Sequence, residues 1–187
     1  MPDSLQGHLI VAAPKLRDPN FFKAVVLLVQ HNEQGALGLI LNRPLGATIE
    51  AAWEQVTDTP CLVSGVLHQG GPCEGPLMVL HGEPELSQIE VTSGVHFSTE
   101  KDAIEQLVGR DDAGRTRMRF FVGYSGWGPG QLEAEIEQAS WLSAPAAAEQ
   151  VFGPTDDLWD AVMKLIARSA ATPFMDPKTI PDDPSVN

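Results

Sequence analysis

The stretch Gly123-Tyr124-Ser125-Gly126-Trp127-Gly128-Pro129-Gly130-Gln131-Leu132 lies between an apolar, strand-like run and an acidic, helix-like run. Glycine is used where the backbone takes a positive φ or approaches another group closely. Aromatic side chains are unusual here, because most loops are small and polar. We expect one specific backbone shape, with Tyr124 and Trp127 packed as core; an exposed binding surface is the alternative.

Strand-length apolar runs occur through the rest of the chain. Residues 8–13 and 24–30 are continuously apolar, which is typical of strands buried on both faces. The connection 31–35 ends in glycine and precedes the apolar run 36–41, so it predicts an antiparallel hairpin. Further strands are predicted at 61–66, 77–80, 88–91, 95–97 and 118–122.

Amphipathic patterns predict helices over 48–56, 99–108 and 155–169. The first residue of each, Thr48, Thr99 and Thr155, can act as an N-cap. Strands outnumber helices, and there is no regular βαβ alternation. The predicted fold class is therefore α+β.

A chain of 187 residues with 43% hydrophobic content suits one ordinary domain, which we assign to residues 1–170. Residues 171–187 are rich in Pro and Asp, and we expect a mobile tail. No apolar run approaches the roughly 20 residues of a membrane span, and the N-terminus has no signal-peptide pattern. These features predict a cytoplasmic protein without membrane contact.

The charge balance is acidic, with 25 Asp and Glu against 12 Lys and Arg and a net charge of −13. Such a chain repels nucleic acid at long range, so direct nucleic-acid binding is not expected. A DNA-associated regulator is an alternative that requires two basic groups to merge into one patch. These groups are Lys15, Arg17, Lys23 and Arg43, and Arg110, Arg115, Arg117 and Arg119.

Ser125 invites comparison with a nucleophile elbow, which needs the pattern Gly-x-Ser-x-Gly in a parallel sheet. Trp127 stands at the last position, and the chain lacks the parallel sheet. A hydrolase using Ser125, with His81 or His96 as base, is therefore an alternative rather than the main hypothesis.

No metal or cofactor site is predicted. Cys61, His68, Cys73 and His81 lack the close pairing of zinc ligands, and the two cysteines are expected to be reduced. The glycines after residue 122 fit neither dinucleotide nor Walker patterns, and acidic residues follow them. We expect no cofactor.

Three blocks of sequence resemble the YqgE/AlgH family of bacterial proteins. They are Gly7 to Pro14 with 18–22 and Gly35 to Pro44; Gly70-Gly71-Pro72 with Val79-Leu80-His81; and Gly123 to Glu133 with Trp141-Leu142. Ser125 and Cys73 depart from the family, where alanine and an aliphatic residue are common. If alanine serves at position 125 in relatives, the serine is not their nucleophile.

The resemblance implies an α+β fold whose branched, mainly antiparallel sheet curls into a pseudo-barrel with flanking helices. It supplies no catalytic residues, and some members carry a transcriptional-regulator label. The chain shows no helix-turn-helix. The main hypothesis is a non-enzymatic regulatory or binding module with a protein or small-molecule partner. Its expected single pocket is formed by Asn42, Arg43, Gly70, Gly71, Tyr124, Trp127 and Gln131.

Overall fold

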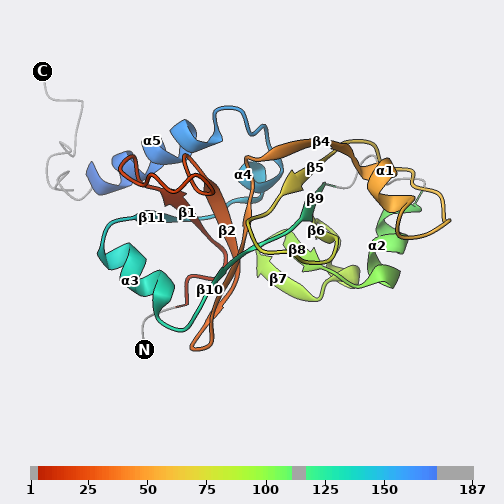
Figure 1. Cartoon of the computed structure of the whole chain (residues 1–187), viewed down its shortest axis with the longest axis horizontal. Coiled ribbons are helices and arrows are strands. Elements are labelled where there is room, and N and C mark those ends of the chain that lie inside the picture. The colour runs from red at the N-terminus through yellow and green to blue at the C-terminus, as the bar shows by residue number, and fades with distance from the viewer. Residues whose placement is uncertain (1–3, 111–116, 172–187) are drawn as a thin grey trace, which may run out of the picture.

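The computed structural model describes residues 4–110 and 117–171. Within them, strands form one five-stranded and one six-stranded sheet, accompanied by five α-helices (Figure 1). The predicted α+β class is confirmed. Ala171 ends the last helix, and the rest of the predicted tail lies outside the described residues.

The first sheet has the strand order β10-β3-β2-β1-β11, and every neighbouring pair is antiparallel. The first strand of the chain pairs with the last, so that His8 lies opposite Pro145. The continuous apolar runs are buried on both faces, as predicted, and the hairpin is confirmed. The strands are β1 (His8–Ala12), β2 (Val25–Asn32), β3 (Gly35–Ile40), β10 (Ser125–Trp127) and β11 (Trp141–Pro145).

The second sheet has the order β4-β5-β9-β6-β8-β7, in which only β5 and β9 run parallel. The strand predicted at 61–66 begins only at its last residue, because Leu62 instead donates its N–H to the carbonyl of Val108. The strands are β4 (Pro44–Thr48), β5 (Val66–Gln69), β6 (Met78–His81), β7 (Ile89–Thr92), β8 (Val95–Ser98) and β9 (Met118–Val122).

The helices are α1 (Ile49–Trp53), α2 (Lys101–Val108), α3 (Gln131–Glu137), α4 (Ala148–Phe152) and α5 (Leu158–Ala171), with a 3-10 turn at Pro84–Leu86. Thr48 caps α1 as predicted, since its hydroxyl accepts from Ala51 N. The prediction for Thr99 is wrong, because Glu100 occupies the cap position and Thr99 bonds to Gln88. α5 begins at Leu158 rather than at residue 155.

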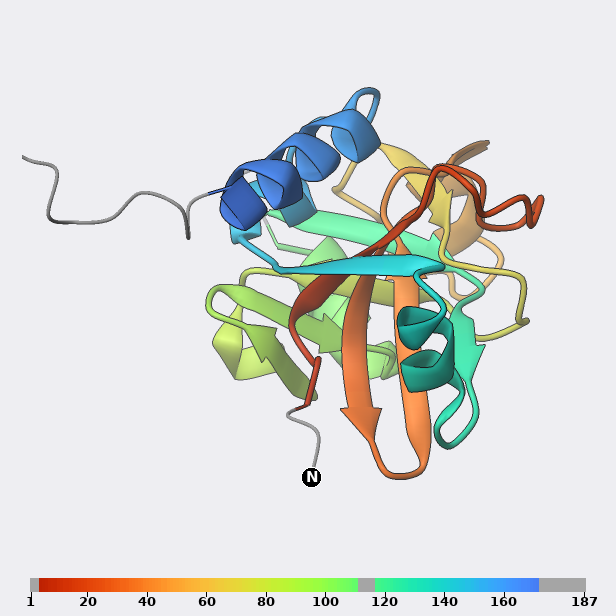
Figure 2. The same cartoon turned by 90° about the vertical axis from the view of Figure 1, so that its left-hand side faces the viewer.

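The pseudo-barrel expectation is wrong, because both sheets are open. The largest core cluster lies between them, with side chains such as Leu27 of β2 and Phe121 of β9. A second cluster packs α1 and α2 against the outer face of the six-stranded sheet, and a third packs α3 against the five-stranded sheet (Figures 1 and 2). Closing one sheet on itself would eliminate this layered core.

The chain crosses between the sheets twice, after β3 at residues 41–43 and after β9 at residues 123–124. Gly70 links both crossings, since its carbonyl accepts from Ile40 N and its N–H donates to the carbonyl of Val122. At Gly71 a Cβ would lie 2.2 Å from the carbonyl carbon of Tyr124, so only glycine permits this approach. We call these contacts of Gly70 and Gly71 with the two crossings the sheet junction, and they hold both crossing loops in position.

Candidate functional site

The aromatic stretch is held by a hydrogen-bond network that we call the aromatic lock, formed by Trp127, Gly128, Gln131, Glu135 and Trp141. One carboxylate oxygen of Glu135 accepts from the indole N–H of Trp127 (3.0 Å) and of Trp141 (2.8 Å). Its other oxygen accepts from the Gln131 amide, whose own oxygen accepts from Gly128 N. Trp127 is 6% exposed and stacks near Phe21. Its core packing is therefore confirmed.

Gly70, Gly71 and Tyr124 belong to the sheet junction. Ser125, which follows them, is fully buried, and its hydroxyl donates to the carbonyl of Gly70 (3.1 Å). The two histidines considered as its base have other partners: His81 bonds to Ser98 and His96 to Ser87. The arrangement that a serine hydrolase requires, an accessible hydroxyl paired with an imidazole, is not the arrangement of Ser125.

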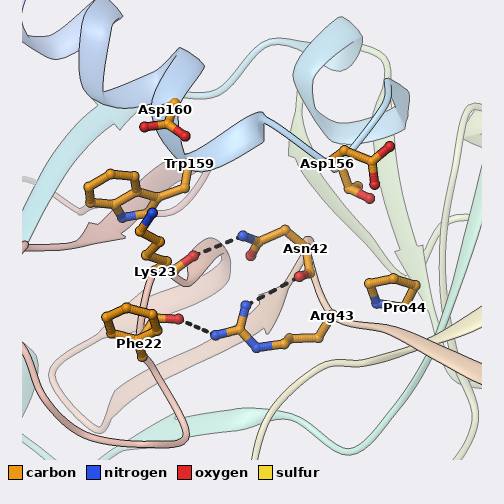
Figure 3. A pocket seen from close by; sticks show the side chains of 9 residues that line it. Phe22, Lys23, Asn42, Arg43, Pro44, Asp156, Trp159 and Asp160 are labelled. Atoms are coloured by element: carbon orange, nitrogen blue, oxygen red, sulfur yellow. Dashed lines mark hydrogen bonds between the residues drawn. The ribbon is translucent and has the colours of Figure 1, made fainter.

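Asn42 and Arg43 line a cleft of about 380 Å³ between the first crossing and the start of α5 (Figure 3). This volume is at the lower end of the range of small-molecule sites. We call it the Arg43 cleft. Its lining residues are Phe22, Lys23, Asn42, Arg43, Pro44, Thr155, Asp156, Trp159 and Asp160.

Asn42 fixes the shape of this cleft. Its side-chain nitrogen donates to the carbonyl of Lys23 (2.8 Å), and its oxygen accepts from Val25 N (2.9 Å). Lys23 has a φ of 52°, which a non-glycine residue rarely adopts. The amide of Asn42 therefore holds the loop before β2 in an unusual conformation.

The guanidinium of Arg43 is tethered by backbone oxygens, those of Asn42 (3.2 Å) and Phe22 (Figure 3). Burial lowers the pKa of Arg43. Across the cleft, Lys23 Nζ lies 5.1 Å from the ring centroid of Trp159, whose indole N–H donates to the carbonyl of Ala12. Both cations are thus held in place by uncharged groups.

Asp156 and Asp160 line the same cleft and are exposed. In the described part of the chain, neither forms an ion pair with Lys23 or Arg43. Charges of both signs therefore face one space without neutralising each other. Such an arrangement can hold a ligand that carries both signs.

The seven residues of the expected single pocket do not line one cleft. Asn42 and Arg43 line the Arg43 cleft, Gly70, Gly71 and Tyr124 form the sheet junction, and Trp127 and Gln131 belong to the aromatic lock. A backbone hydrogen bond from Gln69 N, next to Gly70, to the carbonyl of Arg43 (2.8 Å) links the cleft to the sheet junction.

Lys23, Asp156, Trp159 and Asp160 were missed as cleft residues. Trp159 lies at the edge of the apolar stripe of its helix, one turn before Val162, and it packs against the largest core cluster while also lining the cleft. Because this position is also typical of a core residue, the sequence pattern alone did not indicate a cleft.

The second basic group is engaged within the protein. Arg110 contacts Glu83 (3.2 Å), Arg117 contacts Glu149 (3.7 Å), and Arg119 is buried and donates to the carbonyl of Gly153 (2.6 Å). Arg115 lies outside the described residues. The part of this group that the structure describes offers little free charge for DNA.

Residues 4–110 and 117–171 contain neither a cluster of metal-ligating side chains nor a helix that could cross a bilayer. No cluster of three or more His, Cys, Asp or Glu side chains there is arranged to hold a metal ion, so Cys61, His68, Cys73 and His81 do not form a tetrad. In the same residues, no helix combines the length and apolarity needed to cross a bilayer.

Comparisons with known proteins agree with the sequence motifs. A UPF0301 protein of Ruegeria pomeroyi is 37% identical over 89% of this chain and 94% of its own length. A UPF0301 protein of Chlorobaculum tepidum is 34% identical over 97% of this chain and 95% of its own.

Two solved structures share the fold. The solution structure of the AlgH protein from Pseudomonas aeruginosa has a TM-score of 0.68 and 30% identity, covering 100% of this chain and 98% of that one. The crystal structure of a Corynebacterium diphtheriae protein has a TM-score of 0.70 at 23% identity, covering 88% of each chain, and shows the fold alone. The AlgH-like family model matches residues 9–171, and the chain belongs to the AlgH-like family.

Proposed function

We propose that this protein is a non-enzymatic regulatory or binding module of the cytoplasm and that its ligand occupies the Arg43 cleft. The observation that carries this proposal is the guanidinium of Arg43, which backbone oxygens hold at the cleft and no carboxylate of the described residues neutralises. A charge held in position before a ligand arrives loses little conformational entropy on binding.

The ligand class follows from the lining. Lys23 and Arg43 offer positive charge, Asp156 and Asp160 offer negative charge, and Trp159 offers an aromatic face. A small polar molecule with both an acidic and a basic group, such as an amino acid or a short peptide, complements this lining. A regulatory role would then act through this ligand or through a protein partner. Nucleic acid is a poor partner for a chain with a net charge of −13.

Native purification tests the proposal. The full chain is recovered from lysate and small molecules are identified in its denatured extract, for wild type, Arg43→Gln and Arg17→Gln. Arg17 is exposed and lies outside the cleft, so it is the matched control. We expect a zwitterionic compound with wild type and Arg17→Gln, and at least a tenfold smaller amount with Arg43→Gln. Equal recovery from all three proteins would contradict the proposal.

The hydrolase alternative has a separate test. If Ser125 were a nucleophile, Ser125→Ala would abolish turnover of acyl esters. We expect wild type and Ser125→Ala to give the same background rate with 4-nitrophenyl acetate, because the hydroxyl is buried against Gly70.

A further inference from the structure

A second cavity opens where β5 and β9 separate. The two parallel strands pair only at His68 with Phe121 and at Gln69 with Val122, so their preceding residues diverge. The space between them has a volume of about 310 Å³. Its lining includes apolar Ile49, Val63 and Phe120, and polar Ser64, His68 and Arg119. We call it the Arg119 cavity.

Two buried nitrogens of this lining have no hydrogen-bond partner in the described structure, Nη1 of Arg119 and Nδ1 of His68. The two residues are only 9% and 8% exposed. Nη2 of Arg119 donates to the carbonyl of Gly153, which holds the guanidinium in place, while Nη1 has no partner among the described residues. Buried polar atoms in folded proteins are nearly always satisfied, so two exceptions on residues that line the same cavity indicate a missing partner.

The charge of the cavity is uncompensated as well. None of the described residues that line it is Asp or Glu, although the whole chain carries 25 of them. Burial lowers the pKa of Arg119 to about 10, so the guanidinium remains charged near neutral pH. Burial, followed by the charge of Arg119, lowers the pKa of His68 to about 4, although the backbone groups of Phe120 and Val66 oppose this. The cavity therefore holds one positive charge and one neutral imidazole.

We propose that the Arg119 cavity binds the carboxylate of a small, largely apolar organic acid, with Nη1 of Arg119 and Nδ1 of His68 as donors. One carboxylate matches one guanidinium, whereas a phosphate dianion would bury an excess negative charge. The apolar lining suits the body of the acid. Leu62 and Val66, which are 52% and 44% exposed, extend this apolar surface at the same cavity. This site is separate from the Arg43 cleft.

Titration of the full chain with benzoate and with benzamide, its neutral analogue, tests the proposal by calorimetry. We expect saturable binding of benzoate at least tenfold tighter than that of benzamide. Arg119→Met should weaken benzoate at least tenfold. The matched control is Arg117→Met, since Arg117 is a largely exposed neighbour that contacts Glu149, and it should leave the affinity unchanged.

The imidazole of His68 supplies a second readout. Bound benzoate should raise the pKa of His68 from about 4 by at least one unit, as followed by NMR, because a nearby anion favours the protonated ring. His81 is an internal reference, since its pKa is also about 4 but its ring nitrogens already bond to Ser98 and Glu83. It should not respond.

Three results would overturn the proposal. Benzoate could bind no better than benzamide, or Arg119→Met could retain full benzoate affinity while circular dichroism shows it folded. Phenylphosphonate could also bind more tightly than benzoate, which would contradict the assignment of a monocarboxylate. If Arg119→Met fails to fold, the shift of His68 in the wild-type chain decides, and its absence counts against the site.

Discussion

The aromatic lock around Glu135 and the Arg119 cavity are opposite solutions to burying polar groups. In the lock, each indole N–H of Trp127 and Trp141 bonds to the same carboxylate. In the cavity, a guanidinium and an imidazole nitrogen are buried without partners in the described structure. The difference teaches that the most unusual sequence segment can be purely structural, while an ordinary-looking strand contains the incomplete site.

The first prediction concerns the sheet junction, from which the chain continues into the aromatic lock. Gly71→Ala places a Cβ against the backbone of Tyr124 and Ser125, where no flexible side chain can yield. We expect a loss of more than about 4 kcal/mol in the free energy of unfolding, measured by urea titration. Gly46→Ala is the matched control, because a Cβ there meets nothing within 4 Å. Similar losses in both variants would contradict the close-approach argument.

The second prediction addresses the lock directly. Glu135→Ala leaves two indole N–H groups and the Gln131 amide without their acceptor, which should lower the free energy of unfolding by about 3 kcal/mol. Tryptophan fluorescence during urea unfolding gives the value. Exposed Glu137 lies on the same helix, and Glu137→Ala should change stability by less than about 0.5 kcal/mol. A small loss with Glu135→Ala would contradict the view that the buried indole N–H groups depend on this carboxylate.

The third prediction concerns pH. The pKa of His81 is lowered to about 4, chiefly by burial and then by His96. Because the unfolded chain binds the proton first, stability should fall as the pH drops from 6.5 to 4, by about 2 kcal/mol from this residue. The loss from this residue is complete only well below pH 4, where the ring is protonated in the folded chain as well. His81→Gln should flatten the pH dependence of urea unfolding.

The smallest expected effect is that of a substitution in the Arg119 cavity, which is compared directly with Glu135→Ala in the lock. Arg119→Met replaces a charge that lacks a carboxylate partner by an apolar side chain of similar length. We expect the free energy of unfolding of the unliganded protein to fall by only about 1 kcal/mol, because removal of an unpaired buried charge offsets part of the lost hydrogen bond to Gly153. A loss as large as that of Glu135→Ala would show that the guanidinium stabilises the fold through its hydrogen bond to Gly153. The cavity would then be a structural element like the lock.

Much of the fold was predictable from burial patterns. The runs at 8–13 and 24–30 are continuously apolar because both faces of β1 and β2 are covered. β10 and β11 were missed, because Ser125–Trp127 and Trp141–Pro145 are short and contain small or polar residues. The division into two sheets depends on long-range pairing, which local patterns do not encode.

The candidate sites were predictable only in part. Asn42 and Arg43 end an apolar run, so their position at a cleft is consistent with a loop after a strand. Arg119 was grouped with Arg110, Arg115 and Arg117 as a basic group considered for DNA binding, although it precedes Phe120 and Phe121 in a predicted strand. A charged residue within an apolar predicted strand is the sequence feature that could have indicated a buried charge. Which charges find partners depends on tertiary contacts, such as the one with Gly153.

The pairing of β1 with β11 has a consequence for biosynthesis. His8 lies opposite Pro145, so the first strand made waits for nearly the whole domain before its outer edge is covered. An emerging chain therefore exposes an apolar strand edge during translation, a state prone to association with other chains. Ribosome-bound fragments that end before Trp141 should depend on chaperones, and release of the completed chain should remove this dependence.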